Sequence, residues 1–293
     1  MHHPSTLSPA RGRQISWTRI ARDALSVAGV ISLLFFWREG WPPGLGVDTY
    51  AYWVVDAAAP YHTDGDPLEI GAFRYSPAAA QILGLINWLP WDAMFWLWMV
   101  VLFAAVAYIG RWWSVAVLGL PPVLISLWYG NIDVLLAVAV VAGFRWPAAW
   151  AFPLLTKVTP GLGLLWFAVR REWRNLAIAL GVTAGIAAVS FAFAPGLWWE
   201  WPQALMAVSG YPGGDSLALR IVAAAALVTW GALTGRRWTV VVAAALSNPT
   251  ISGRGFAILI GVVPLIRWDR ATSRADEAGT AASGAAAPGT ASS

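Results

Sequence analysis

The chain has 293 residues, of which 58% are hydrophobic and 12% are charged, and its mean hydropathy is +0.61. A soluble domain carries about 25% charged residues, so this composition predicts an all-α polytopic membrane protein. The absence of cysteine excludes disulfides and thiolate metal sites, and with only three histidines we expect neither a metal nor a cofactor. The net charge of +4 includes no basic, aromatic-rich soluble segment, which argues against nucleic-acid binding.

The amino-terminal residues 1–15 are polar, and we expect a disordered cytoplasmic segment there. Four basic residues precede an apolar run at residues 25–37: Arg11, Arg13, Arg19 and Arg22. No small-residue cleavage site follows this run, so the pattern predicts an uncleaved first helix whose amino end is cytoplasmic. The chain after the helix then emerges on the outer face.

A polar interval at residues 47–79 interrupts the apolar sequence and lies within a predicted first outer loop, 38–90. It contains five acids and six aromatic residues: Asp48, Asp56, Asp64, Asp66, Glu69, Tyr50, Tyr52, Trp53, Tyr61, Phe73 and Tyr75. Carboxylates accept hydrogen bonds from sugar hydroxyls, and aromatic rings stack on the apolar faces of sugars. The interval therefore suits a sugar site, and the alternative is a solvated loop between two membrane helices.

Residues 76–90 are too short to span a membrane and predict a helix on the outer surface. Apolar runs between residues 16 and 268 otherwise predict about ten crossings, with a second outer loop at 195–215 and a disordered cytoplasmic tail at 269–293. This arrangement puts both termini and most arginines in the cytoplasm of a plasma-membrane protein, as the positive-inside rule requires. Several of the predicted spans are only ten to thirteen residues long, which favours tilted helices or helices that end in a water-filled cavity.

Charged residues at the outer ends of these helices are the candidates for chemistry, because charges at membrane depth are costly and usually functional. They are Asp48, Asp133, Lys157, Asp215, Arg220 and Arg254. Lys157 is the only lysine in the chain. It either binds a phosphate or a lipid headgroup, or it is a lysine that extends to the membrane interface.

Several ordered motifs resemble those of glycosyltransferase family 87, integral-membrane mannosyltransferases of the GT-C fold. They are Asp48 with Tyr52, Phe73-Arg74-Tyr75-Ser76-Pro77, Gly130-Asn131 with Asp133, Lys157-Val158-Thr159-Pro160, and Asp215-Ser216-Leu217 with Arg220. The chain departs from the family pattern at Ala78, where a second proline is usual, and at Gly253-Arg254, where the family has Trp and His. The resemblance covers roughly residues 16–268 and implies a GT-C-like bundle.

The resemblance implies transfer of a hexose, mannose above all, from a polyprenyl-phosphate donor to a lipid-linked or glycan acceptor. An inverting displacement needs one base, for which Asp48 is the candidate. Lys157, Arg220 and Arg254 are candidates for the donor phosphate. The candidates for the sugar and acceptor are Tyr50, Tyr52, Trp53, Tyr75, Asn131, Asp133, Asp215 and Ser216. A retaining mechanism would need a second carboxylate about 5 Å away, from Asp133 or Asp56.

Two other classes of function remain open. A transporter or flippase of lipid-linked sugars would also place polar residues within a bundle of broken helices. A catalytically inactive family relative that acts as a binding subunit would fit the altered Gly253-Arg254 motif. Loss of transfer on removal of Asp48 would distinguish an enzyme from both.

Overall fold

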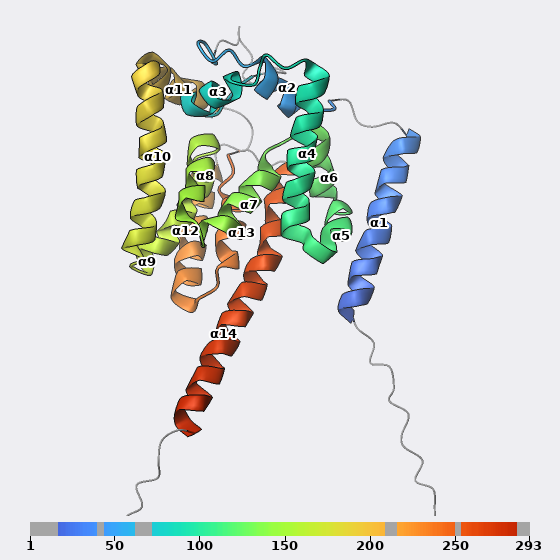
Figure 1. Cartoon of the computed structure of the whole chain (residues 1–293), viewed down its shortest axis with the longest axis vertical. Coiled ribbons are helices and arrows are strands. Elements are labelled where there is room, and N and C mark those ends of the chain that lie inside the picture. Colours follow the sequence, from blue (N-terminus) through green and yellow to red (C-terminus); the bar gives the residue numbers. More distant parts are fainter. Residues whose placement is uncertain (1–16, 40–43, 62–71, 209–215, 250–252, 286–293) are drawn as a thin grey trace, which may run out of the picture.

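A computed structural model describes residues 17–39, 44–61, 72–208, 216–249 and 253–285 (Figure 1). Within these ranges every regular element is helical, which confirms the predicted all-α class. The α-helices are α1 (Trp17–Glu39), α2 (Val47–Val54), α3 (Pro77–Gly84), α4 (Trp91–Gly110), α5 (Ser114–Leu118), α6 (Pro121–Tyr129), α7 (Asp133–Gly143), α8 (Ala151–Thr156), α9 (Leu165–Val169), α10 (Trp173–Phe193), α11 (Pro195–Val208), α12 (Leu217–Thr234), α13 (Trp238–Leu246) and α14 (Val262–Ala285). Shorter-pitch 3₁₀ segments are η1 (Arg111–Trp113), η2 (Pro147–Trp150), η3 (Thr159–Leu164) and η5 (Gly253–Gly261).

Three helical segments in the described ranges are long and apolar enough to cross a membrane. They are Trp91–Leu118, Trp173–Phe193 and Leu217–Thr234. A fourth crossing is possible if α6 and α7, which meet at a bend of 112°, together form one broken span. The structure therefore supports a membrane protein with three or four candidate spans and does not confirm the ten predicted crossings.

The difference arises from short apolar helices in the second half of the chain. The runs predicted as crossings near residues 147–169 and 240–266 fold into α8, α9 and α13, joined by 3₁₀ segments. These helices have six, five and nine residues, so each is about 14 Å long or less, against a hydrocarbon core of about 30 Å. Neighbouring protein segments bury many of the apolar side chains in this region, and Trp150 of η2 and Phe167 of α9 are fully buried.

The polar segments are more helical than the sequence predicts. The interval predicted as an outer loop contains α2, and α3 covers the first part of the predicted surface helix. The second predicted outer loop contains α11, and the tail expected to be disordered from residue 269 is helical to Ala285 in α14. The expected disorder at residues 1–15 lies outside the described residues.

The two ends of the bundle differ in composition. At one end α2, α3 and α11 gather over the start of α4, at the top of Figure 1. The opposite end holds the beginning of α1, the α9–α10 connection and the α12–α13 turn, and α14 extends beyond it. The α9–α10 connection carries Arg170 and Arg171, and the α12–α13 turn carries Arg236 and Arg237. We call this second end the arginine-rich end.

Candidate active site

A polar cluster forms where the start of α2 meets the break between α6 and α7. Asn131 Nδ2 donates a hydrogen bond of 2.7 Å to Asp48 Oδ2, and the backbone N–H of Asp133 donates one of 2.9 Å to Asn131 Oδ1. Asn131 therefore bridges α2 and α7 and uses both ends of its amide. The side chain of Asn131 is buried, so this bridge lies in the interior.

Two cations extend the cluster at either side of Asn131. Arg254 Nη1 lies 3.3 Å from Asp48 Oδ2, and Lys157 Nζ lies 2.6 Å from Asp133 Oδ1. The guanidinium of Arg254 also lies over the ring of Tyr129, with 5.1 Å between Cζ and the ring centroid, which is a cation–π contact. The cluster is thus a continuous chain of contacts from Arg254 through Asp48, Asn131 and Asp133 to Lys157.

Glycines set the close approach of α2 to the α6–α7 break. Gly46 and Gly130 both adopt left-handed backbone conformations, with φ of 68° and 69°, which glycine adopts without strain. The N–H of Gly46 donates to the carbonyl of Trp128 at 2.8 Å and ties the start of α2 to the end of α6. A Cβ on Gly130 would lie 1.8 Å from Thr49 Oγ1, so only glycine lets the neighbouring Asp48 reach Asn131.

Lys157 is positioned by a strained turn. Val158 has φ 53° and ψ −59°, and the N–H of Thr159 bonds to the carbonyl of Lys157 at 2.5 Å. This geometry is the rare γ-turn with positive φ, which is unfavourable for a β-branched residue. Ser247 Oγ, at the end of α13, donates to the carbonyl of Thr159 at 3.2 Å and supports the turn from the other side.

Two tyrosines lie beside the carboxylates, Tyr52 buried and Tyr75 partly buried. The hydroxyls of Tyr52 and Tyr75 are 2.9 Å apart, and Tyr52 packs edge-on against Trp98, with 5.2 Å between ring centroids. Burial raises the pKa of Tyr52 and of Tyr75 well above the usual value of 10.0, and the negative charge of Asp48 raises both further. Both phenols therefore stay protonated and can donate hydrogen bonds, but they cannot serve as bases at neutral pH.

Other predicted site residues lie apart from the cluster. Tyr50 and Trp53 pack against Trp91 at the start of α4, with ring centroids 5.7 and 5.5 Å from it. Trp53 Nε1 also donates to the carbonyl of Leu89 at 2.8 Å. The helical period explains why Tyr50 and Trp53 lie apart from Asp48 whereas Tyr52 lies beside it. Tyr52 is four residues from Asp48 and therefore shares its face of α2.

Arg220 binds main-chain carbonyls at the end of α13. Its guanidinium donates to the carbonyls of Leu246, Asn248 and Pro249 at 3.2, 2.6 and 3.1 Å, and its Nε contacts the hydroxyl of Ser216 at 3.3 Å. These bonds satisfy carbonyls at a helix end and stabilise the turn that follows α13. Asp215, the remaining predicted residue, lies outside the described residues.

Sequence reasoning missed Tyr129 and did not predict the pairing of Arg254 with Asp48. Both follow from the bend that brings residue 129 over the start of η5. The position of Tyr129, directly before Gly130-Asn131, was the available signal for it. Among the described residues, no group of three or more histidine, aspartate or glutamate side chains could hold a metal ion.

Fold and site together define a helical membrane protein with a charged, partly accessible cluster at one end of its bundle. Residues 73–288 match the family model of glycosyltransferase family 87, and the chain belongs to this family. This confirms the resemblance seen in the sequence and identifies the chain as a membrane glycosyltransferase. The match includes Asn131, Asp133, Lys157 and Arg254, whereas Asp48 on α2 precedes it. No curated protein and no solved structure matches the chain.

Proposed function

We propose that this chain transfers a hexose, with mannose as the favoured sugar, from a polyprenyl-phosphate donor to a lipid-linked or glycan acceptor. The transfer is an inverting single displacement on the outer face of the plasma membrane. The observation that carries this proposal is the carboxylate of Asp48, which is 18% exposed and held between an amide and a cation at the end of the bundle.

Asp48 is the general base in this mechanism. Asn131 and Arg254 both hold Oδ2, and among the described residues no hydrogen bond occupies Oδ1. The acceptor hydroxyl attacks the anomeric carbon as its proton passes to Asp48 Oδ1, and the bond between that carbon and the phosphate oxygen breaks with inversion. The fixed Oδ2 orients the carboxylate for this proton transfer.

The leaving polyprenyl phosphate gains negative charge when the bond breaks, because a singly charged phosphodiester becomes a phosphate monoester. A cation beside its oxygens stabilises that charge. Arg254 suits this role because its side chain is 34% exposed and its partner Asp48 becomes neutral when it accepts the proton. The same proton transfer therefore frees Arg254 for the phosphate.

Lys157 supplies a second positive charge to the same region. Its pairing with Asp133 leaves a neutral pair, so its contribution to phosphate binding is weaker than that of Arg254. Tyr75, which is partly buried and protonated, offers its hydroxyl to the sugar, and the buried Tyr52 orients that hydroxyl through their hydrogen bond. Together these groups form a site for a lipid-linked sugar phosphate.

The charge distribution supports the proposed orientation. The cluster lies with α2 at one end of the bundle, and the connections at the opposite end carry arginines. Cytoplasmic connections are enriched in Lys and Arg, so the arginine-rich end is assigned to the cytoplasm and the cluster to the outer face. A polyprenyl-phosphate sugar on that face requires no nucleotide, and the sequence has no nucleotide-binding Gly-rich motif.

A transporter of lipid-linked sugars is the second candidate, favoured by the break between α6 and α7. Discontinuous helices that place polar groups inside a bundle are typical of transporter binding sites. In that case Asp48 would bind the cargo but transfer nothing.

Sugar transfer in proteoliposomes tests the proposal. Purified wild type receives radiolabelled polyprenyl-phosphate mannose and a mixed lipid acceptor fraction, beside Asp48→Asn and the matched control Asp56→Asn. Asp56 is exposed, and within the described part of the chain its side chain accepts a single local bond, from the N–H of Ala58. We expect Asp48→Asn to reduce transfer by about 10²–10⁴-fold while the control retains it.

Normal turnover by Asp48→Asn would remove Asp48 as the base. Donor binding without product from wild type would favour another acceptor or an inactive relative. Movement of the labelled lipid between leaflets by both wild type and Asp48→Asn, without product, would favour the transporter.

A further inference from the structure

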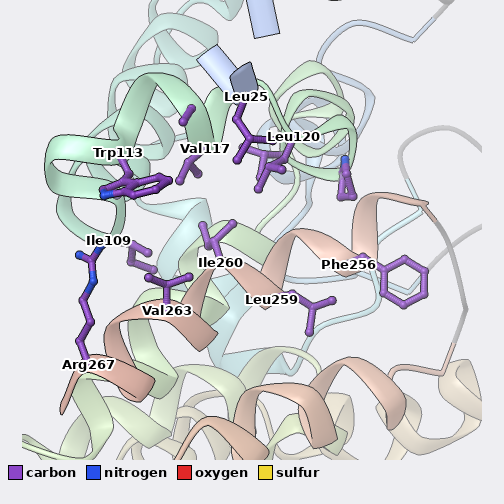
Figure 2. Close-up of a pocket in the computed structure, with 14 residues that line it drawn as sticks. Leu25, Ile109, Trp113, Val117, Leu120, Phe256, Leu259, Ile260, Val263 and Arg267 are labelled. Carbon is purple, nitrogen blue, oxygen red and sulfur yellow. The ribbon is translucent and has the colours of Figure 1, made fainter. Parts of the chain in front are cut away.

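An apolar cavity lies away from the Asp48 cluster, between α1, α5, α6, η5 and α14 (Figure 2). Its volume is about 310 Å³, and nearly all of its lining is aliphatic or aromatic. Leu25 comes from α1, Val117 and Leu120 from α5 and the residues after it, and Leu259 and Ile260 from η5. None of the five residues of the cluster lines this cavity, so the two are separate sites.

The cavity is elongated along one face of η5 and α14. Phe256, Ile260, Val263 and Arg267 all line it, at spacings of four, three and four residues. With a rise of about 2.0 Å per residue in η5 and about 1.5 Å in α14, this face is about 19 Å long. Phe256 and Val263 are 39% and 50% exposed, so the cavity is a groove that opens to the surrounding membrane.

One end of the groove is polar. Arg267 and Trp113 lie at the same end in Figure 2, and Phe256 lies at the other. Among the described residues Arg267 forms no ion pair, whereas the nearby Asp269 is bound by Arg237 at 2.8 Å. An arginine beside an indole, at the end of an apolar groove, is the pattern found at a membrane–water interface.

Helix α1 forms one wall of the groove through a contact between two glycines. A Cβ on Gly29 would lie 2.5 Å from the Cα of Gly119, and a Cβ on Gly119 would lie 2.4 Å from the carbonyl oxygen of Leu25. This close approach lets Leu25 reach the groove and resembles the small-residue contacts by which membrane helices associate. The position of this wall is therefore fixed by the packing of α1 against the residues after α5.

We infer that this groove binds a glycerophospholipid with an anionic headgroup. The phosphate lies at Arg267, the headgroup contacts Trp113, and an acyl chain follows the groove towards Phe256. The unpaired positive charge selects an anionic over a zwitterionic lipid, and the apolar lining of about 19 Å accommodates the chain. This inference is independent of the proposed transfer activity.

Native mass spectrometry of the full-length protein tests the inference. Detergent-solubilised protein is titrated with phosphatidylglycerol or phosphatidylcholine, and the fraction of protein carrying one lipid is measured. The variants are Arg267→Gln, which removes the charge, and Val263→Trp, which fills the groove from an exposed position. Arg270→Gln is the matched control, because Arg270 is exposed on α14 and does not line the groove.

We expect wild type and Arg270→Gln to prefer phosphatidylglycerol at least threefold over phosphatidylcholine. Arg267→Gln should lose this preference, and Val263→Trp should lose retention of both lipids. Equal preference in Arg267→Gln and wild type would overturn the inference, as would loss of the preference in Arg270→Gln. Displacement of phosphatidylglycerol by an equimolar polyprenyl phosphate would assign the groove to the donor lipid and also overturn it.

Discussion

The two carboxylate–cation pairs of the cluster differ in distance and in exposure. Asp133 and Lys157 are 2.6 Å apart, and their side chains are 2% and 16% exposed. Asp48 and Arg254 are 3.3 Å apart, and their side chains are 18% and 34% exposed. The first pair is nearly closed to water and joins α7 to the turn after α8, whereas the second is longer and more exposed. We therefore expect the first pair to stabilise the fold and the second to act in the proposed transfer.

The first prediction concerns the buried pair. Asp133→Ala leaves the ammonium group of Lys157 buried without its partner, and breaking such a pair costs about 3–5 kcal/mol. We expect a fall of about 3 kcal/mol in the unfolding free energy, measured by SDS titration in mixed micelles, because Lys157 keeps some access to water. Asp92→Ala, at an exposed position in the first turn of α4, is the control.

The double variant Asp133→Leu with Lys157→Met sharpens this test. Replacing both charges of a buried pair by apolar residues is often neutral for stability. We expect it to recover most of the lost unfolding free energy. If Asp133→Ala is as stable as wild type, the pair does not hold the fold together and the contrast between the two pairs fails.

The second prediction concerns the open pair. Arg254→Gln removes a cation that is about one-third exposed, so the unfolding free energy should fall by less than about 1 kcal/mol. Transfer should fall by about 10²-fold, because the charge that develops on the leaving phosphate loses its partner. A variant with wild-type kcat would show that Arg254 only positions Asp48 or has no role in transfer.

The third prediction concerns Gly130, the glycine at the close approach of α2 to the break between α6 and α7. Gly130→Ala places a methyl group against Thr49 Oγ1 and forces alanine into a left-handed conformation. Overpacking of this kind costs about 1–3 kcal/mol, and we expect a loss of about 2 kcal/mol in unfolding free energy together with lower transfer. Gly235→Ala has a similar φ of 71° but open space around it, so it isolates the backbone cost from the clash. Equal losses in the two variants would mean that the contact with Thr49 is unimportant.

The sequence alone predicts which charged residues are functional candidates, because charges in apolar helices stand out. Asp48, Asn131, Asp133, Lys157 and Arg254 were all predicted from composition and motif order, and the structure brings them together. Their pairing was not predictable from the sequence. It depends on the 112° bend between α6 and α7 and on the close contact of Gly130 with Thr49 of α2. The roles assigned to these residues stay predictions until transfer is measured.

The number of membrane spans was less predictable than the residues of the site. Hydropathy measures how apolar a segment is, but a short helix buried by its neighbours is as apolar as a span. Trp150, Trp166 and Phe167 illustrate this, because all three lie in short segments and are fully buried by protein. Similarly, polarity alone does not distinguish a loop from a helix such as α2. Its Tyr52 packs against Tyr75, which precedes α3, and its Trp53 packs against Trp91 of α4.

The last prediction uses the tyrosines beside the open pair and has the smallest effect at neutral pH. The pKa values of Tyr52 and Tyr75 in the folded protein are above 10.0, so folding favours their protonated forms. Their contribution to stability is therefore complete below pH 10 and falls as the pH rises above it. The expected slope is about 1.4 kcal/mol of unfolding free energy per pH unit for each such tyrosine.

Unfolding of wild type at pH 9.5 and pH 11 should show this loss, and the double variant Tyr52→Phe with Tyr75→Phe should show a smaller one. Some dependence should persist in the double variant, because burial also raises the pKa of Tyr61. The control Tyr108→Phe changes an exposed tyrosine on α4 and should keep the wild-type slope. An unchanged slope in the double variant would show that the two phenols are open to water, and the face of α2 beside Asp48 would then be as exposed as the carboxylate itself.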